Sequence, residues 1–253
     1  MRGAIGNLDV AQLVLYAFWF FFAGLIFYLR REDRREGYPL ESEGQRGFKP
    51  RNLIWIPEPK TFLRPDGRKV KAPNYKPDTR PVSATKTEPW PGAPLTPTGD
   101  PLLANVGPGS YAERADETYK TADGHDLLAP LRVATNYAVP PGSANPSGFA
   151  VFGTDRVQAG VIRDLWVDRA ESILRYYEVT LTGGRSVLLP VYFADVDTKQ
   201  RRVTVNALKA SQFAGIPGTK NPDKVTLLEE DKVSAYYGAG TLYATPDRVE
   251  PLI

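Results

Sequence analysis

Two groups of ionisable residues have types and spacings that could support proton chemistry. The first is Asp123-Gly124-His125-Asp126, in which carboxylates flank the single imidazole of the chain. An imidazole with an ordinary pKa can accept and release protons near neutral pH. The second group mixes acids and arginines around Trp166: Arg163, Asp164, Asp168, Arg169, Glu171 and Arg175. Both patterns are also typical of exposed turns and solvated ion pairs, so neither identifies a site by itself.

The composition excludes several classes of site. The 253-residue chain has no cysteine and one histidine, His125, which excludes disulfides, thiolate metal sites and sites built from two or three imidazoles. It also lacks a GxxxxGKS/T phosphate loop, a GxGxxG turn and a GxSxG nucleophile elbow. The formal net charge of +3 gives no signature of nucleic-acid binding. We therefore expect no metal, no nucleic-acid partner and no catalytic triad.

The elements that position these groups begin with an apolar segment near the N-terminus. Residues 10–29 contain no charge and a single polar side chain, Gln12. A helix of twenty residues spans about 30 Å, the thickness of a bilayer core. A cleaved signal peptide would have a shorter apolar core and a small-residue cleavage site, and a buried soluble helix rarely lacks a polar face. The sequence therefore predicts a transmembrane helix over residues 10–30, with Asp9 as its N-cap.

Basic residues flank this segment unequally. One arginine precedes it, whereas four arginines follow it between positions 30 and 35. Because basic residues favour the cytoplasmic side, we expect residues 1–9 to form a periplasmic tail and the rest of the chain to be cytoplasmic. The span is rich in aromatic residues, and Ala17 and Gly24 share one face, which suits contact with lipid or with neighbouring helices.

Residues 31–110 form a proline-rich segment. Fourteen of the 23 prolines lie between Pro39 and Pro108, which excludes long helices and central strands there. A disordered linker is one interpretation. However, the segment also carries apolar residues that a linker seldom needs: Leu53, Ile54, Trp55, Ile56, Phe62, Leu63, Tyr75 and Trp90. We expect an ordered, extended arm that lies along a protein surface, its own or a partner's.

Residues 111–253 have the patterns of a small β domain. A strand is predicted over residues 157–167. The segments 177–181 and 187–193 alternate and flank Gly183-Gly184, which predicts a hairpin. Closely spaced short strands of this kind are typical of a small barrel or sandwich.

The end of the chain predicts one more strand and one helix. The strand is expected over residues 202–207, and Thr226-Leu227-Leu228-Glu229 is a capping box that begins a helix near 226–238, with Gly238 as its stop. The expected fold class is therefore a single N-terminal transmembrane α-helix plus a mainly antiparallel β domain with a short C-terminal helix.

Short motifs spread over nearly the whole chain resemble one known family. They are Phe18-Trp19, Gly24-Leu25-Ile26, Arg35-Glu36-Gly37-Tyr38-Pro39-Leu40-Glu41, Pro59-Lys60-Thr61-Phe62, Pro97-Thr98-Gly99-Asp100-Pro101, Trp166-Val167-Asp168, Val205-Asn206-Ala207-Leu208, Phe213-Ala214-Gly215-Ile216-Pro217 and Val225-Thr226-Leu227-Leu228-Glu229-Glu230-Asp231-Lys232. In their order and spacing, these motifs resemble the H subunit of the purple-bacterial photosynthetic reaction centre.

The resemblance implies a PRC-barrel-type core near residues 145–215. It implies the L and M subunits as partners, which would hold the bacteriochlorophylls, bacteriopheophytins, quinones and non-haem iron, while this chain would bind none of these directly. A light-harvesting antenna ring and membrane lipids would be further neighbours. The location would be the bacterial inner (intracytoplasmic photosynthetic) membrane.

The resemblance also implies roles for six residues as proton-relay candidates: Glu171, Asp168, Arg175, Asp123, His125 and Asp126. Glu171 matches the inner relay glutamate of the family, and Asp123 and His125 match the region where protons enter. Where some members have a second histidine, this chain has Asp126, which could replace it as an acceptor.

The implied function is that of a non-catalytic subunit that caps the cytoplasmic face of L and M, stabilises the complex and conducts protons to the secondary quinone. The alternative is a membrane-tethered PRC-barrel binding or assembly module without a photosynthetic role. A membrane-anchored hydrolase that depends on His125 is a third, weaker hypothesis. The first two differ in the arm, because residues 40–105 should resist proteases within a complex and be cleaved in a module that acts alone.

Overall fold

The computed structural model describes residues 4–5, 8–36, 56–64, 66–75 and 78–249. The chain divides into two compact units: unit 1 is Met1–Thr79 with Pro89–Gly92, and unit 2 is Arg80–Glu88 with Ala93–Ile253. Three apolar residues of the predicted arm, Leu53, Ile54 and Trp55, lie outside the described residues.

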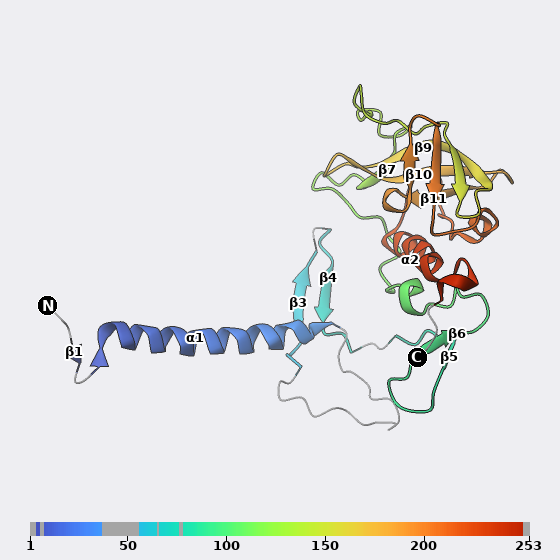
Figure 1. The fold of residues 1–253 in the computed structure, drawn as a ribbon. Coiled ribbons are helices and arrows are strands. Elements are labelled where there is room, and N and C mark those ends of the chain that lie inside the picture. Colours follow the sequence, from blue (N-terminus) through green and yellow to red (C-terminus); the bar gives the residue numbers. More distant parts are fainter. Residues whose placement is uncertain (1–3, 6–7, 37–55, 65, 76–77, 250–253) are drawn as a thin grey trace. The chain divides into compact units, whose positions relative to one another are not determined.

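Unit 1 contains the predicted apolar helix. Strands β1 (Ala4–Ile5) and β2 (Leu8–Asp9) pair just before helix α1, which spans Val10–Glu32 and continues into a 3₁₀ turn at Asp33–Arg35 (Figure 1). Asp9 is the N-cap, as predicted, and accepts a hydrogen bond from the backbone N–H of Ala11. No residue of α1 is buried. Among the described helices, this one alone is long and apolar enough to cross a membrane.

A β-hairpin is attached to the C-terminal end of α1. Strand β3 (Lys60–Leu63) pairs with β4 (Lys69–Ala72). Nη1 of Arg35 donates hydrogen bonds to the backbone carbonyls of Glu58 at 2.8 Å and Ala72 at 2.9 Å. Because these carbonyls lie at the base of the two strands, one guanidinium fixes the hairpin to the helix end.

Unit 2 contains the next part of the proline-rich arm. Strand β5 (Ala84–Lys86) pairs with β6 (Leu95–Pro97), and the 3₁₀ turn η2 (Gly107–Gly109) packs on helix α2 (Leu227–Tyr243). A Cβ atom at Gly238 would lie 2.5 Å from the carbonyl oxygen of Pro108, so this approach requires glycine. This part of the arm therefore lies along a surface of its own unit.

A seven-stranded sheet forms the body of unit 2. The strands are β7 (Leu128–Pro130), β8 (Ala150–Gly153), β9 (Gln158–Asp168), β10 (Ile173–Leu181), β11 (Ser186–Pro190), β12 (Asp195–Asp197) and β13 (Arg202–Val205). Their order is β11-β10-β9-β8-β13-β12, with β7 also paired to β9 (Figure 1). Pairing is antiparallel throughout, except between β13 and β8.

The core of unit 2 is continuous from the sheet to α2. Its largest fully buried side chains include Trp166 and Ile162 from β9, Leu189 from β11, Phe213 from the 3₁₀ helix η4 (Ala210–Gly215) and Tyr237 from α2. Burial of each apolar side chain of this size contributes about 1.5–3 kcal/mol. The predicted fold class is confirmed, including the capping box of Thr226 and Glu229 at the start of α2.

Two local predictions are wrong. The strand expected over 187–193 ends at Pro190, and Val191–Phe193 form a 3₁₀ turn instead. Helix α2 does not stop at Gly238 but continues to Tyr243. Gly238 and Gly240 serve close packing rather than termination, since a Cβ at Gly240 would lie 2.1 Å from the carbonyl oxygen of Ala207.

Candidate functional site

The turn between β9 and β10 brings three of the predicted residues together. Asp168 is only 3% exposed. Its Oδ1 accepts hydrogen bonds from the backbone N–H groups of Ala170 at 2.9 Å and Glu171 at 3.1 Å. Its Oδ2 accepts from Nε and Nη2 of Arg175, both at 3.3 Å. The local sequence dictates this arrangement, because an aspartate that ends a strand can cap the following turn with its own side chain.

Arg175 connects this buried carboxylate to an exposed one. Its Nη2 also donates to Oε2 of Glu171 at 3.0 Å, and the side chain of Glu171 is 60% exposed. The pair of acids therefore extends from solvent at Glu171 to the interior at Asp168, with one guanidinium between them.

A cavity of about 400 Å³ lies beside this cluster. Besides Asp168 and Arg175, its lining consists of Arg114, Tyr119, Leu127, Leu128, Tyr176, Tyr192, Leu227 and Glu230. Helix α2 contributes Leu227 and Glu230 to this lining. Sheet and helix thus present acids to the same space.

Glu230 and Tyr176 form a hydrogen-bonded pair in this cavity. The hydroxyl of Tyr176 donates to Oε2 of Glu230 at 3.0 Å. Burial raises the pKa of Glu230 above its ordinary value, although the bond from Tyr176 opposes the shift. Burial and the neighbouring carboxylate raise the pKa of Tyr176, so its hydroxyl stays protonated and remains a donor. A carboxyl group whose pKa is raised toward neutrality is suited to exchanging protons.

The other predicted group forms a solvent-facing turn. Backbone N–H groups of Thr121 and Gly124 close it by donating to the carbonyls of His125 at 2.9 Å and Thr121 at 3.0 Å. Gly124 has a φ of +82°, which explains the glycine at this position. The side chains of Asp123 and His125 are exposed. Both are therefore accessible to protons from bulk water.

Asp126 differs from its two neighbours because it is held by cations. Its carboxylate accepts hydrogen bonds from Thr118 at 2.6 Å and from Lys120, and it forms an ion pair with Lys224 at 3.3 Å. Burial alone would raise the pKa of Asp126, but the bonds from Lys120, Thr118 and Lys224 outweigh it and lower the pKa to about 2. An acid this strong holds few protons near neutral pH.

The two predicted groups lie at the same end of strand β9. Strand β7 pairs with β9 so that Leu128 is the register partner of Asp168. Arg169 strengthens the junction: its backbone N–H donates to the carbonyl of Leu127 at 2.9 Å and its Nη1 to the carbonyl of Asp126 at 3.2 Å. The exposed turn at His125 therefore lies next to the turn that contains Glu171.

Sequence reasoning did not identify Tyr176 and Glu230. The available signal for Glu230 was its place directly after the capping-box glutamate, in the first turn of a helix that must pack on the sheet. Glu229 is consumed by the cap and by the backbone N–H of Lys220, which leaves Glu230 to face the cavity. The alternation of apolar and polar residues along β10 did not indicate which of Tyr176 and Tyr177 faces the cavity.

Another buried acid, Glu178, belongs to a structural ion network. Its carboxylate accepts a hydrogen bond from the indole N–H of Trp166 at 3.2 Å and is paired with Arg132. Arg132 also binds Asp164 at 2.9 Å and Asp223 at 3.0 Å. Because its carboxylate is bonded to Trp166 and Arg132, Glu178 helps to join β10 to the loop before α2, and we assign it a structural role.

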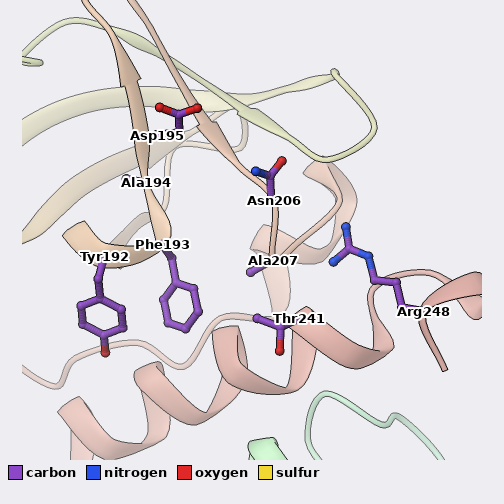
Figure 2. Close-up of a pocket in the computed structure, with 8 residues that line it drawn as sticks. All are labelled: Tyr192, Phe193, Ala194, Asp195, Asn206, Ala207, Thr241 and Arg248. Carbon is purple, nitrogen blue, oxygen red and sulfur yellow. The ribbon is translucent and has the colours of Figure 1, made fainter. Parts of the chain in front are cut away.

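A second cavity, of about 370 Å³, lies between the 191–195 segment and α2. Figure 2 shows that the polar groups of Asp195, Asn206, Thr241 and Arg248 lie apart around the rim, whereas Phe193 occupies the middle. The guanidinium of Arg248 is already bound to the carbonyl of Gly240 and the hydroxyl of Thr154. This cavity therefore lacks a converging set of reactive groups. No group of His, Asp and Glu within the described ranges could hold a metal ion.

Two family models match the chain. The model of the photosynthetic reaction centre H-chain N-terminal region matches residues 3–133, just over half of the 253 residues. The model of the PRC-barrel domain matches residues 142–212, which include β8 to β13.

Proposed function

Because the chain belongs to the family of photosynthetic reaction centre H chains, we propose that it caps the cytoplasmic face of the L and M subunits and conducts protons toward the secondary quinone. As an H chain it is a membrane-anchored subunit of the reaction centre, and this membership implies association with L and M. The capping and proton-conducting roles are the proposal.

The observation that carries the proton-conducting role is a set of acids at the end of strand β9 that differ in their exposure to solvent. Glu171 is exposed, Asp168 is buried, and Arg175 is bonded to both. Reduction of a quinone to a quinol consumes two protons, and a site shielded from water must receive them through groups that can exchange protons. A carboxylate that reaches solvent and a buried one linked by a single guanidinium supply the first steps of such a path.

We place proton uptake at the exposed turn that holds Asp123 and His125. These two side chains face solvent next to the Glu171 turn, as an uptake site requires. Asp126 is the weakest member of the set, because a pKa of about 2 and its bonds to two lysines favour a structural role in holding the turn. Glu230 joins the path as a half-buried acid with a raised pKa in the lining of the same cavity as Asp168.

The proposed orientation in the membrane follows from the unequal number of arginines on the two sides of the apolar segment. The four arginines after the apolar segment support a periplasmic N-terminus and a cytoplasmic domain. In this arrangement the subunit is non-catalytic and binds no cofactor directly; the bacteriochlorophylls, bacteriopheophytins, quinones and non-haem iron belong to L and M. The antenna ring and the lipids of the photosynthetic membrane are further neighbours.

The test is Glu171→Gln in the intact, pigment-containing complex. The expected result is slower proton-coupled transfer of the second electron to the secondary quinone, by on the order of tenfold or more, with the first electron transfer unchanged. Asp195→Asn, which removes an exposed acid beside the other cavity, serves as the matched control and should leave both rates unchanged. Unaltered second-electron kinetics in Glu171→Gln would remove Glu171 from the path.

A further inference from the structure

The β3–β4 hairpin of unit 1 is uncovered in the part of the chain that the structure describes. All four residues of β3 and three of the four in β4 are exposed. Phe62 is 47% exposed, Leu63 72% and Val70 44%. A two-stranded hairpin is marginally stable alone in water, and exposed apolar side chains that cluster usually mark a contact surface. The hairpin therefore needs an outside surface to lie on.

The register of the hairpin separates its two faces. Phe62 lies opposite Val70 on one face, and alternation places Lys60 on that face as well. On the other face, Thr61 lies opposite Lys71. One face is therefore apolar at its centre, and the other carries Leu63 together with the basic side chains of Lys69 and Lys71.

The first residue of the apolar face, Lys60, contacts α1. Lys60, which shares this face, donates to Glu32 of α1 at 2.7 Å, and its ammonium group lies 5.7 Å from the ring centroid of Tyr28, one turn earlier. Figure 1 shows the two strands at the C-terminal end of α1, projecting to one side of the helix. When α1 spans a bilayer, a hairpin fixed to its end lies close to the membrane surface, and the face whose Lys60 reaches back to Glu32 and Tyr28 lies on the side of the lipid.

The hairpin also carries a strong positive charge. Residues 60–72 contain five basic side chains and one acid, Asp66. Asp66 is already bound by Arg68 at the tip of the hairpin. Lys69 and Lys71 have no ion-pair partner in the described ranges. Both faces of one hairpin lie within about one Debye length, 8–10 Å, of the surface on which it rests, so these lysines act on headgroup charges from either face.

We propose that this hairpin is a lipid-docking element whose Phe62–Val70 face enters the headgroup region of anionic phospholipids at the end of the transmembrane helix. Apolar insertion and attraction of basic side chains to lipid phosphates are the two terms that hold interfacial elements. The inference rests on the transmembrane placement of α1 and not on the proton path. It makes the hairpin a second membrane contact, which fixes the chain where it leaves the bilayer.

The test uses the full chain in nanodiscs, and the absence of native cysteines allows a single label. A fluorophore at Val70→Cys reports the apolar face, and one at Thr61→Cys is the matched control on the opposite face. Quenching by brominated acyl chains is measured in phosphatidylcholine alone and with about one third phosphatidylglycerol. The expected result is quenching of the Val70 label that increases with phosphatidylglycerol, and little quenching of the Thr61 label.

The lysines are tested by Lys69→Gln combined with Lys71→Gln. Since each basic side chain at an anionic surface contributes about fivefold, the double variant should shift the docking equilibrium about 30-fold and remove the dependence on phosphatidylglycerol. A control that removes two exposed charges from the β12–β13 hairpin, Lys199→Gln with Arg202→Gln, should leave the docking equilibrium and its dependence on phosphatidylglycerol unchanged.

Three results overturn the proposal. They are equal quenching on the two faces, no response to phosphatidylglycerol, and shielding of the Val70 label only when the L and M subunits are present. The last would assign this face to a protein contact. Pigment content of the preparation that also contains the L and M subunits, measured by absorption, reports separately on the proposed reaction-centre function, so absence of pigment there would leave the lipid result on the chain alone standing.

Discussion

The Tyr176–Glu230 pair makes a pH-dependent prediction for Tyr176→Phe. This substitution removes the hydroxyl that donates to Glu230 at 3.0 Å and leaves the rest of the side chain in place. Burial raises the pKa of Glu230, and the bond from Tyr176 limits that rise. Loss of the bond should therefore raise the pKa of Glu230 further, because its ionised form loses a donor that water cannot fully replace.

The size of the effect depends on the charge of Glu230. A hydrogen bond to a charged group contributes about 1.5–3 kcal/mol, and a neutral one about 0.5–1.5 kcal/mol. At pH 8 the unfolded chain has Glu230 ionised, so folding of the variant must either bury an unpaired carboxylate or take up a proton. At pH 4, below its ordinary value of 4.5, the group is mostly protonated in the unfolded chain and more fully so in the folded one. The penalty should thus be larger at pH 8 by about 1–1.5 kcal/mol, the difference between a charged and a neutral hydrogen bond.

The assay is urea unfolding of the full chain in detergent between pH 4 and 8, followed by the emission of Trp166, which is 1% exposed. The other tryptophans are replaced by phenylalanine in every variant. Tyr119→Phe is the matched control, since Tyr119 lines the same cavity but its hydroxyl has no partner there; its effect should stay within about 0.5 kcal/mol at all pH values. In a Glu230→Gln background the pH dependence of the Tyr176→Phe penalty should vanish. A penalty of equal size at pH 4 and pH 8, or one that survives Glu230→Gln, would refute the reasoning.

Three further predictions concern packing and charge in unit 2. Arg132→Met removes the nearer of two guanidinium groups from the buried carboxylate of Glu178, which keeps only the exposed Arg163 at 3.5 Å, and should destabilise the domain by about 2–4 kcal/mol, measured by urea unfolding. Gly238→Ala places a Cβ atom 2.5 Å from the carbonyl oxygen of Pro108 and should release the 107–109 turn, seen as new protease cleavage near it, even though alanine favours the helix itself. Asp126→Asn should abolish a loss of stability that the native chain shows as pH falls from about 4 toward about 2, because the lowered pKa of Asp126 stabilises the folded state only while the carboxyl is ionised.

Each of these has a comparison variant. Arg202→Met removes an exposed guanidinium and should change stability by less than about 0.5 kcal/mol. Gly183→Ala adds a methyl group to open space and should leave the cleavage pattern unchanged. Asp123→Asn alters an exposed acid and should leave the acid-induced loss intact. If a comparison variant behaves like its partner, the contact in question is not the cause.

Elements with local signals could be predicted from the sequence, because each signal reports a contact within a few residues. The N-cap at Asp9, the turn at Gly184 and the capping box at Thr226 are of this kind. Gly238 shows the limit. A glycine after an amphipathic segment usually ends a helix, but here the reason for glycine is the backbone of Pro108, 130 positions earlier in the chain, and no local pattern contains that partner.

The parts of the candidate site that are close in sequence could be predicted to lie together, whereas the parts from distant segments could not. Asp168, Glu171 and Arg175 lie within eight positions, so a single turn can gather them, and it does. Glu230 comes from a helix more than fifty residues later, and its raised pKa depends on burial that only the packed cavity creates. Asp126 shows the opposite shift, since its pKa is lowered in part by Lys224, a partner that lies far along the chain.

The relation between the exposed turn and the acid turn depends on the shortest strand of that edge. β7 is three residues long, and its pairing sets Leu128 opposite Asp168. Because side chains alternate along a strand, a slip of one residue would exchange the two faces of β7, whose three residues are all buried, and would move the His125 turn along β9. Arg169 opposes this slip through its two bonds to the carbonyls of Asp126 and Leu127. The relation between the two turns is therefore fixed by backbone pairing, so the exposed acids Asp123 and Glu171 can be altered without moving the strands, whereas Asp168 also holds the backbone of the Glu171 turn.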